Sequence, residues 1–135
     1  MKFLSDEWIE LAKQITTKKL HPEKDLKKAT ASLLNIIENI PPDGRKVYLY
    51  ISVKNGIIED MLIDKTGSLL EKDAEFVVTG NYETFVQIIK GEMSSLIALI
   101  KNRIKITGDK LKALQFSKSI DKLNECLREI DTQYY

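Results

Sequence analysis

Two periods alternate in the hydrophobic pattern of this chain, one typical of helices and one typical of strands. Apolar residues recur at helical spacing between residues 5 and 19, at Trp8, Leu11, Ala12 and Ile15. Asp6 and Glu7 suit the positive end of a helix, so an amphipathic helix is predicted here, anchored on the core by Trp8. The pair His21-Pro22 ends it, because a residue before proline avoids the helical conformation. A short second helix is predicted over residues 22–29, with the proline in its first turn.

The next segments are patterned for strands, with one ambiguity. Residues 30–40 fit a helical face better than strict alternation, yet a turn sequence, Pro41-Pro42-Asp43-Gly44, and a clear strand over residues 45–53 follow them. Helix and strand both remain open for residues 30–40. Asn55-Gly56 is a strong hairpin signal, and its partner strand covers residues 57–63. That strand is predicted to turn Ile57, Met61 and Ile63 to one side and Asp60 and Asp64 to the other.

Residues 74–114 carry the most informative order of elements. A strand around Phe76 and Val78 is followed by two apolar-faced helices joined at Lys90-Gly91-Glu92, and then by a strand containing Ile104 and Ile106. Both strand-to-helix corners are predicted to be made in the same way. Gly80 and Gly108 supply backbone angles that a β-branched residue cannot adopt, and Asn81 and Asp109 supply N-caps.

The C-terminal residues predict one more helix. Its apolar stripe consists of Phe116, Ile120, Leu123, Leu127 and Ile130, with a break expected near residues 117–119, where serine can cap a new helix. The order of elements predicts an α+β fold in which a three-stranded antiparallel meander precedes two further strands and the helices gather on one face of the sheet. At 135 residues, the chain is expected to form a single domain over residues 1–135.

Composition excludes several classes of protein. With 43% hydrophobic residues, 30% charged residues and a net charge of +1, the chain is typical of a folded globule and does not suggest nucleic-acid binding. One cysteine, Cys126, allows no intramolecular disulfide and is expected to be structural. Together with the lone His21, it cannot build a His/Cys zinc site. No phosphate-binding loop or nucleophile elbow is present, so no catalytic residue, metal or cofactor is expected, and the chain is predicted not to be an enzyme.

No apolar run approaches the 18 or so residues of a membrane span, and Met1–Trp8 carries acids where a signal peptide would continue with apolar residues. The expected location is the cytoplasm. A basic cluster consists of Lys18, Lys19, Lys24, Lys27 and Lys28. It is expected to be a solvated face, and the alternative is transient attraction to an anionic membrane surface.

The corner motifs Val-Thr-Gly-Asn-Tyr-Glu-Thr-Phe (78–85) and Ile-Lys-Ile-Thr-Gly-Asp (104–109) resemble the sterol carrier protein 2 (SCP2) family. The resemblance is clearest over residues 74–114 and fair over 45–64. The start Phe-Leu-Ser-Asp-Glu-Trp resembles the N-terminal helix of archaeal and bacterial single-domain members. The resemblance implies that residues 32–39 are a strand. It also implies a five-stranded, mainly antiparallel sheet and a hydrophobic tunnel between the sheet and the helices, partly closed by the C-terminal helix.

Carried over by position, the resemblance implies two groups of lipid-binding residues. The tunnel wall is expected to include Phe85, Ile89, Met93, Leu96, Ile97 and Ile100. The closing side is expected to include Leu114, Phe116 and Ile120. The residues alone favour a packed core at these positions, because a helix that is apolar all round is usually buried.

The implied function is lipid binding or lipid transfer. The ligand would be a fatty acid, a fatty acyl-CoA, an isoprenoid or a sterol-like molecule, and Leu96→Arg or Ile100→Arg is expected to abolish binding. The alternative is a protein-interaction or dimerisation module with a filled core, serving a separate enzyme through the sheet face that bears Tyr48 and Tyr50.

Overall fold

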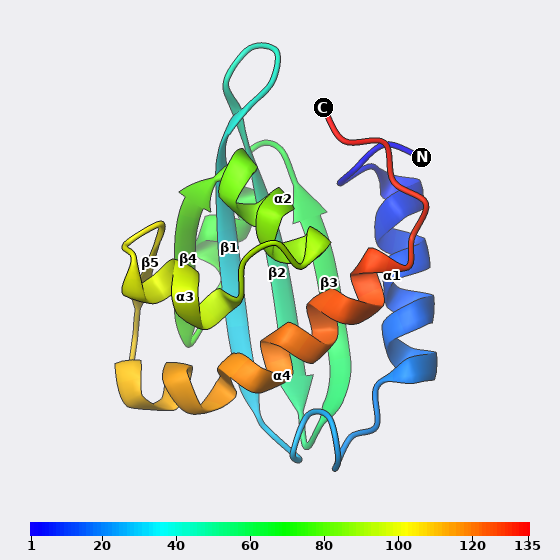
Figure 1. Ribbon diagram of the computed structural model, residues 1–135, viewed down its shortest axis with the longest axis vertical. Coiled ribbons are helices and arrows are strands. Elements are labelled where there is room, and N and C mark those ends of the chain that lie inside the picture. Colours follow the sequence, from blue (N-terminus) through cyan, green and yellow to red (C-terminus); the bar gives the residue numbers. More distant parts are fainter.

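The structure is a computed structural model that describes residues 1–135, and it contains one five-stranded sheet. The strands are β1 (Ala31–Ile40), β2 (Arg45–Lys54), β3 (Ile57–Asp64), β4 (Phe76–Asn81) and β5 (Ile104–Thr107). The α-helices are α1 (Asp6–Lys19), α2 (Tyr82–Lys90), α3 (Ser95–Ile100) and α4 (Lys110–Arg128). A short 3₁₀ helix, η1 (Ser68–Glu71), lies between β3 and β4. Figure 1 shows α2, α3 and α4 on one face of the sheet and α1 beside its β3 edge.

The strand order is β3-β2-β1-β4-β5. The first three strands form an antiparallel meander, β4 pairs with β1 in parallel, and β5 returns antiparallel to β4. This mixed, mostly antiparallel sheet confirms the predicted α+β class. It also resolves the ambiguity over residues 30–40, because they form the central strand, as the family resemblance implied.

Trp8 anchors α1. Ser5 caps this helix by accepting a hydrogen bond from the Trp8 backbone N–H at 3.2 Å. The Trp8 side chain is fully buried, and its Nε1–H donates to Thr132 Oγ at 3.0 Å. The N-terminal helix is thus held against both the core and the C-terminal tail.

The prediction of a short helix over residues 22–29 is wrong. These residues form turns, and Lys27 and Lys28 have φ of 51° and 53°, which a right-handed helix excludes. Instead, His21 Nδ1 accepts hydrogen bonds from the backbone N–H groups of Glu23 and Lys24, each at 3.1 Å. The histidine is exposed and stabilises a turn.

The break predicted in the C-terminal helix is also wrong, because α4 runs without interruption through residues 117–119. The Ser117 hydroxyl donates to the Leu114 carbonyl at 2.7 Å, within the preceding turn. Serine hydroxyls form this bond in a continuing helix as readily as they cap a new one.

The predicted side of Ile57 is wrong as well. Ser52 pairs with Asp60 but Val53 pairs with Ile58, so Glu59 is an extra residue in β3. Such a bulge reverses the faces of the residues before it. Ile58 therefore packs against the core, while Ile57 is 58% exposed. Met61 and Ile63, after the bulge, keep their predicted side.

The two strand-to-helix corners differ, although they were predicted to be alike. Gly108 has φ of 115°, and the Asp109 carboxylate accepts hydrogen bonds from two backbone N–H groups of the first turn of α4. Gly80 has no left-handed backbone, and its need for glycine is steric, because a Cβ would lie 2.9 Å from Ile104 Cγ2. The Asn81 side chain caps nothing and instead accepts from Asn39 Nδ2 at 2.6 Å.

Candidate ligand-binding cavity

A cavity of about 110 Å³ lies between the sheet and the helical layer. Alternation along the strands supplies its floor, because side chains two residues apart share a face. The floor residues are Leu33, Asn35 and Ile37 of β1, Leu49 and Ile51 of β2, Phe76 and Val78 of β4, and Ile104 and Ile106 of β5. Four of the five strands therefore contribute to one apolar surface.

The helices supply the roof. Its residues are Phe85, Ile88 and Ile89 of α2, Ser95, Leu96 and Leu99 of α3, and Ala113, Phe116, Ser117, Ile120, Leu123, Asn124 and Leu127 of α4. Phe3 and Trp8 complete the lining, and their rings meet edge to face at 5.0 Å. The long helix α4 covers the largest share of this roof.

The lining is apolar, with 20 hydrophobic residues among 24, and no titratable side chain belongs to it. Three of the four polar residues already have partners. Asn35 donates to the Leu49 carbonyl at 3.1 Å, Ser95 to Asp121 Oδ1 at 2.9 Å and Ser117 to a carbonyl of its own helix. Only Asn124 has a side chain with no hydrogen bond to the protein. The arrangement can hold an apolar group, and the hydroxyls of Ser95 and Ser117 are engaged in hydrogen bonds within the protein.

Five of the nine predicted lipid-binding residues meet at this cavity: Phe85, Ile89, Leu96, Phe116 and Ile120. Met93 is half-buried against the core but does not line the cavity. The other three point outward, with exposed fractions of 41% for Ile97, 63% for Ile100 and 41% for Leu114. The six-residue helix α3 explains this division, because Leu96 and Leu99 occupy one face and Ile97 and Ile100 the other. Contact of all nine with a ligand stays a prediction.

Sequence reasoning missed the floor and the Phe3–Trp8 end. The alternation in β2 was visible, and Leu49 and Ile51 could have been assigned to the cavity face from it. Phe3 carried no such signal. It is placed by pairing of the two chain ends, where its N–H donates to the Gln133 carbonyl at 3.1 Å.

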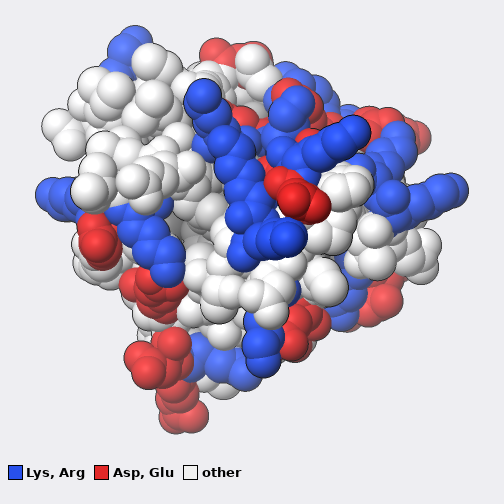
Figure 2. Space-filling model, turned by 90° about the horizontal axis from the view of Figure 1, so that it is seen from below, with Lys and Arg blue, Asp and Glu red and all other residues white.

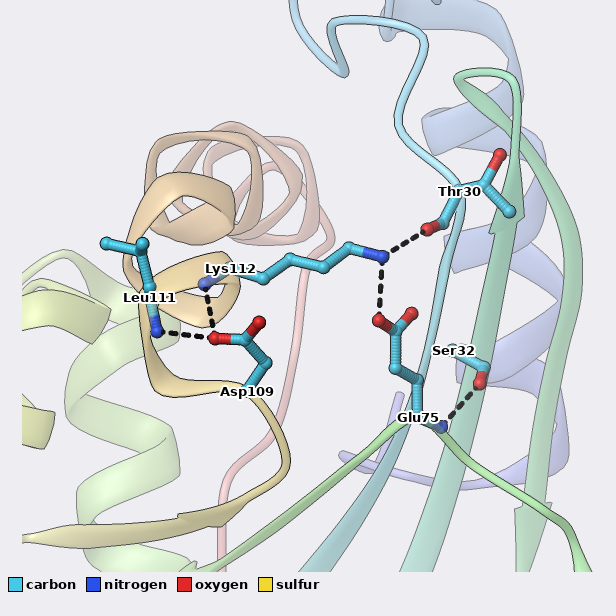
Figure 3. A network of polar contacts seen from close by, with 6 residues as sticks. All are labelled: Thr30, Ser32, Glu75, Asp109, Leu111 and Lys112. Carbon is cyan, nitrogen blue, oxygen red and sulfur yellow. Dashed lines mark hydrogen bonds and ion pairs between the residues drawn. The ribbon is translucent and has the colours of Figure 1, made fainter.

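The helix α4 is attached at both of its ends. At its start, Lys112 Nζ contacts Glu75 Oε2 at 2.6 Å and the Thr30 carbonyl at 3.2 Å. Figure 3 shows this side chain reaching from α4 to the sheet, with Leu111 pointing the other way. At its end, Arg128 Nε donates to the Ile89 carbonyl of α2 at 2.8 Å. The middle of α4 spans the cavity between these two attachments.

The cavity is small for a lipid. Sites for small molecules usually enclose about 300–1,000 Å³, and an engineered cavity of about 150 Å³ holds one benzene ring. The space of about 110 Å³ therefore accommodates a short hydrocarbon fragment. A complete lipid requires the roof to move outward.

Other potential sites of chemistry lie outside the cavity. Cys126 is buried, and burial raises the pKa of its thiol. No cluster of three or more His, Cys, Asp or Glu side chains is placed to hold a metal ion. None of the helices combines the length and the apolar character needed to cross a bilayer.

The sheet order, the one-sided helical layer and the enclosed apolar cavity define a small α+β binding fold. The sequence profile of the SCP-2 sterol transfer family matches residues 9–121. The chain belongs to this family. No curated protein matches it by sequence.

Solved structures share the fold. A conserved hypothetical protein from Thermus thermophilus superposes with a TM-score of 0.79 at 17% identity, over 98% of this chain and 92% of that chain. A crystal structure of sterol carrier protein 2 superposes with a TM-score of 0.76 at 16% identity, over 96% of this chain and 99% of that one.

The same fold also occurs inside an enzyme. The stereoselective inverting sec-alkylsulfatase from Pseudomonas sp. matches 82% of this chain over 15% of its own length, with 20% identity and a TM-score of 0.51. The fold therefore occurs both in free-standing carriers and as one part of larger enzymes.

Proposed function

We propose that this chain is a lipid-binding or lipid-transfer protein that sequesters an apolar ligand between its sheet and its helices. The observation that carries the proposal is the cavity, with 20 hydrophobic residues among 24 and no titratable side chain in its lining. Membership of the SCP-2 sterol transfer family supports it. The ligand classes proposed are a fatty acid, a fatty acyl-CoA, an isoprenoid or a sterol-like molecule. Catalysis is not part of the proposal, and a cytoplasmic location stays a prediction.

Hydrophobic burial would supply the affinity. Each methylene removed from water contributes about 0.8 kcal/mol without any directional bond, and the costs of association and ordering are subtracted from that sum. An acyl chain suits such a site because it offers many methylenes in a narrow cross-section. Phe85, Ile89, Leu96, Phe116 and Ile120 would form the walls of the tunnel, and Asn124 would be available to a polar group of the ligand.

Native mass spectrometry of the purified protein, with organic extraction, tests whether a lipid co-purifies. Titration with a fluorescent fatty acid then tests binding directly, with an expected affinity in the micromolar range. Absence of both a co-purified lipid and titratable binding would contradict the proposal.

Leu96→Arg is the variant that tests the position of the site. A guanidinium in an apolar cavity lacks a partner, so fatty-acid binding is expected to fall below detection. The matched control is Leu70→Arg, since Leu70 is 53% exposed on η1 and does not line the cavity. A folded Leu96→Arg protein, verified by circular dichroism, that bound as tightly as Leu70→Arg would place the ligand elsewhere.

A second candidate function is an interaction or dimerisation module with a filled core. The small volume of about 110 Å³ favours it, as does the occurrence of the fold inside a larger enzyme. Its expected contact surface is partly covered, since Tyr48 and Tyr50 are half-buried and Lys72 Nζ lies 5.2 Å from the centre of the Tyr50 ring. Light scattering over a range of concentrations separates the two: self-association without lipid binding supports the module, and a monomer that binds lipid supports the carrier.

A further inference from the structure

We propose that α3 and the first turns of α4 form a docking surface for the headgroup region of an anionic phospholipid bilayer. This α3–α4 surface consists of four apolar side chains, Ile97, Ile100, Leu111 and Leu114, and three lysines, Lys101, Lys110 and Lys118. The proposal rests on the proposed carrier function, because it names the surface from which the ligand would be taken up or to which it would be delivered.

The apolar part of the surface is unusually concentrated. Eight large hydrophobic residues in the molecule are exposed, and four of them, with exposed fractions of 41–66%, fall within residues 97–114. Ile97 and Ile100 are three residues apart in α3, as are Leu111 and Leu114 in α4, so each pair shares a helix face. The two helices are in contact, since the Ser95 backbone N–H of α3 donates to Asp121 Oδ1 of α4 at 3.1 Å. Exposed apolar side chains that gather on two helices in contact suit an interaction site.

The lysines lie on the same helix faces as the apolar residues. Lys101 is four residues after Ile97, and Lys110 and Lys118 are four residues before and after Leu114. All three are exposed, and none has an acidic partner within 4.0 Å. In Figure 2, on the side where Figure 1 shows α3 and the start of α4, blue side chains border an uncharged area. The cationic groups are therefore available to an external anion.

The charge of this region differs from that of the whole molecule. Residues 95–122 contain seven Lys and Arg but only two acidic residues, a net charge of +5 in a chain whose net charge is +1. Both acids are engaged within the protein. Asp109 accepts hydrogen bonds from backbone N–H groups of α4, and Asp121 accepts from Ser95. Lys112 is engaged as well, with Glu75.

A bilayer suits this combination better than a protein partner does. Helices that lie in a membrane interface present apolar residues flanked by lysines, whose long side chains reach the headgroups. An anionic leaflet attracts each such lysine. The surface lies on the outer side of the same two helices whose inner side lines the cavity with Leu96, Leu99 and Ala113. Docking through this surface would therefore bring the helices that cover the cavity against the bilayer.

The basic cluster at Lys18, Lys19, Lys24, Lys27 and Lys28 lacks this combination. No exposed large hydrophobic residue lies within residues 18–28. Lys19 is paired with Glu129, and Lys28 lies 3.9 Å from Glu23. The cluster thus has charge without apolar contact area, and it provides a matched control.

The test is flotation of the full chain with large vesicles made of equal parts phosphatidylserine and phosphatidylcholine, at low salt. The triple variant Lys101→Glu, Lys110→Glu, Lys118→Glu is expected to bind about 100-fold more weakly, from about 1 kcal/mol per lysine. Leu111→Ser is expected to bind about tenfold more weakly, because insertion of its apolar side chain is lost. The control is Lys18→Glu, Lys24→Glu, Lys27→Glu, which makes the same change in net charge at three other unpaired lysines and is expected to bind like the unmodified protein.

Four results would overturn the proposal, and three of them concern vesicle binding. The unmodified protein could fail to bind the vesicles, the two triple variants could weaken binding equally, or the control triple alone could weaken it. Self-association that Leu111→Ser abolishes, without vesicle binding, would assign the surface to a second copy of the chain and would likewise overturn it.

Fatty-acid titration without vesicles separates this proposal from the carrier function on which it rests. The Lys101/Lys110/Lys118 variant is expected to bind the fluorescent fatty acid with unchanged affinity, because these side chains do not line the cavity. Loss of vesicle binding with fatty-acid binding retained supports the docking surface. An unmodified protein that floats with vesicles but binds no fatty acid would contradict the carrier function alone, and one that binds fatty acid but does not float would contradict the docking surface alone.

Discussion

Asp64 organises the chain where β3 ends. Its carboxylate accepts hydrogen bonds from the N–H and hydroxyl of Thr66, at 2.9 and 2.6 Å. It also accepts from the backbone N–H groups of Gly67 and Leu69, at 2.8 and 3.2 Å. These hydrogen bonds, the Thr66 hydroxyl first, hold the pKa of Asp64 well below its usual range. The charged form is therefore favoured in the folded state.

A depressed folded-state pKa predicts acid-sensitive stability. An unfolded chain protonates this carboxyl near its ordinary pKa of about 3.9, whereas the folded chain keeps it charged to lower pH, so the stabilisation is complete at pH 7 and is lost as pH falls below about 4. Asp64→Asn is expected to lower the free energy of unfolding at pH 7, with a difference from the unmodified protein that shrinks toward pH 3. Urea denaturation at both pH values measures it.

The control is Asp73→Asn, at an exposed carboxylate with no hydrogen bond. It is expected to leave stability unchanged at either pH. A loss in Asp64→Asn that was the same at pH 3 as at pH 7 would show that the loop does not depend on the carboxylate charge. Sequence pattern does not reveal this role, because a carboxylate at the end of a strand looks the same whether it is solvated or holds a turn.

At the scale of elements, the junction between α2 and α3 depends on a residue from the far end of α4. Gly91 ends α2 with φ of 80°, and a Cβ there would lie 2.6 Å from the Arg128 guanidinium carbon. Arg128 needs this space in order to donate to the Ile89 carbonyl, which belongs to the last turn of α2. A cationic side chain at a helix C-terminus also suits the helix dipole.

Gly91→Ala is predicted to be more destabilising than Gly44→Ala. Both glycines have left-handed backbones, with φ of 80° and 76°, so both substitutions incur about 1–2 kcal/mol of backbone strain. A methyl group added at Gly44 would have nothing within 4 Å, whereas one added at Gly91 displaces Arg128. A further loss of about 1 kcal/mol is expected from the disrupted hydrogen bond. Equal losses in urea denaturation would show that the Arg128 contact contributes nothing.

Local pattern predicts single elements well and their mutual register poorly. Helical spacing around Trp8 and alternation in β2 depend on residues that are neighbours in sequence, so the sequence alone was sufficient. The exposed position of Ile57 depends on how β3 pairs with β2, where Glu59 is left over. The predicted helix over residues 22–29 failed for a similar reason, because the turn is stabilised by hydrogen bonds to His21 that propensity does not reveal.

At the scale of the whole molecule, the proposed ligand binding depends on the volume of the cavity that α4 covers. Ala113 lines the cavity near the start of this helix. Ala113→Leu is predicted to fill part of the void, because each buried methylene contributes about 0.8 kcal/mol when space exists for it. The thermal midpoint is expected to rise by a few degrees, and the affinity for a fluorescent fatty acid to fall about tenfold.

Ala74→Leu is the control, since Ala74 is half-buried but does not line the cavity. It is expected to leave the affinity unchanged. Destabilisation by Ala113→Leu with full retention of binding would show that the ligand does not use this part of the cavity.

The corner motifs indicate the fold and the family from sequence alone, because Gly80 and Gly108 stand where a side chain would be too close to neighbouring atoms. The size of the cavity cannot be predicted from such motifs. Its volume is a small difference between large packed volumes, and the outward side of Ile97 and Ile100 follows from the orientation of a six-residue helix. The placement of α3 against β5 and α4 turns Leu96 toward the cavity and leaves Ile97 and Ile100 exposed.

An apolar cavity of about 110 Å³ would make the protein sensitive to pressure whenever no ligand fills it. Unfolding eliminates such a void, and the decrease in volume on unfolding, usually about 20–100 mL/mol, scales with the void that is lost. Compression therefore favours the unfolded chain as long as the cavity is vacant. A lipid that occupied the space would remove most of this volume difference, so the protein with bound lipid would resist unfolding by pressure better than the protein without it.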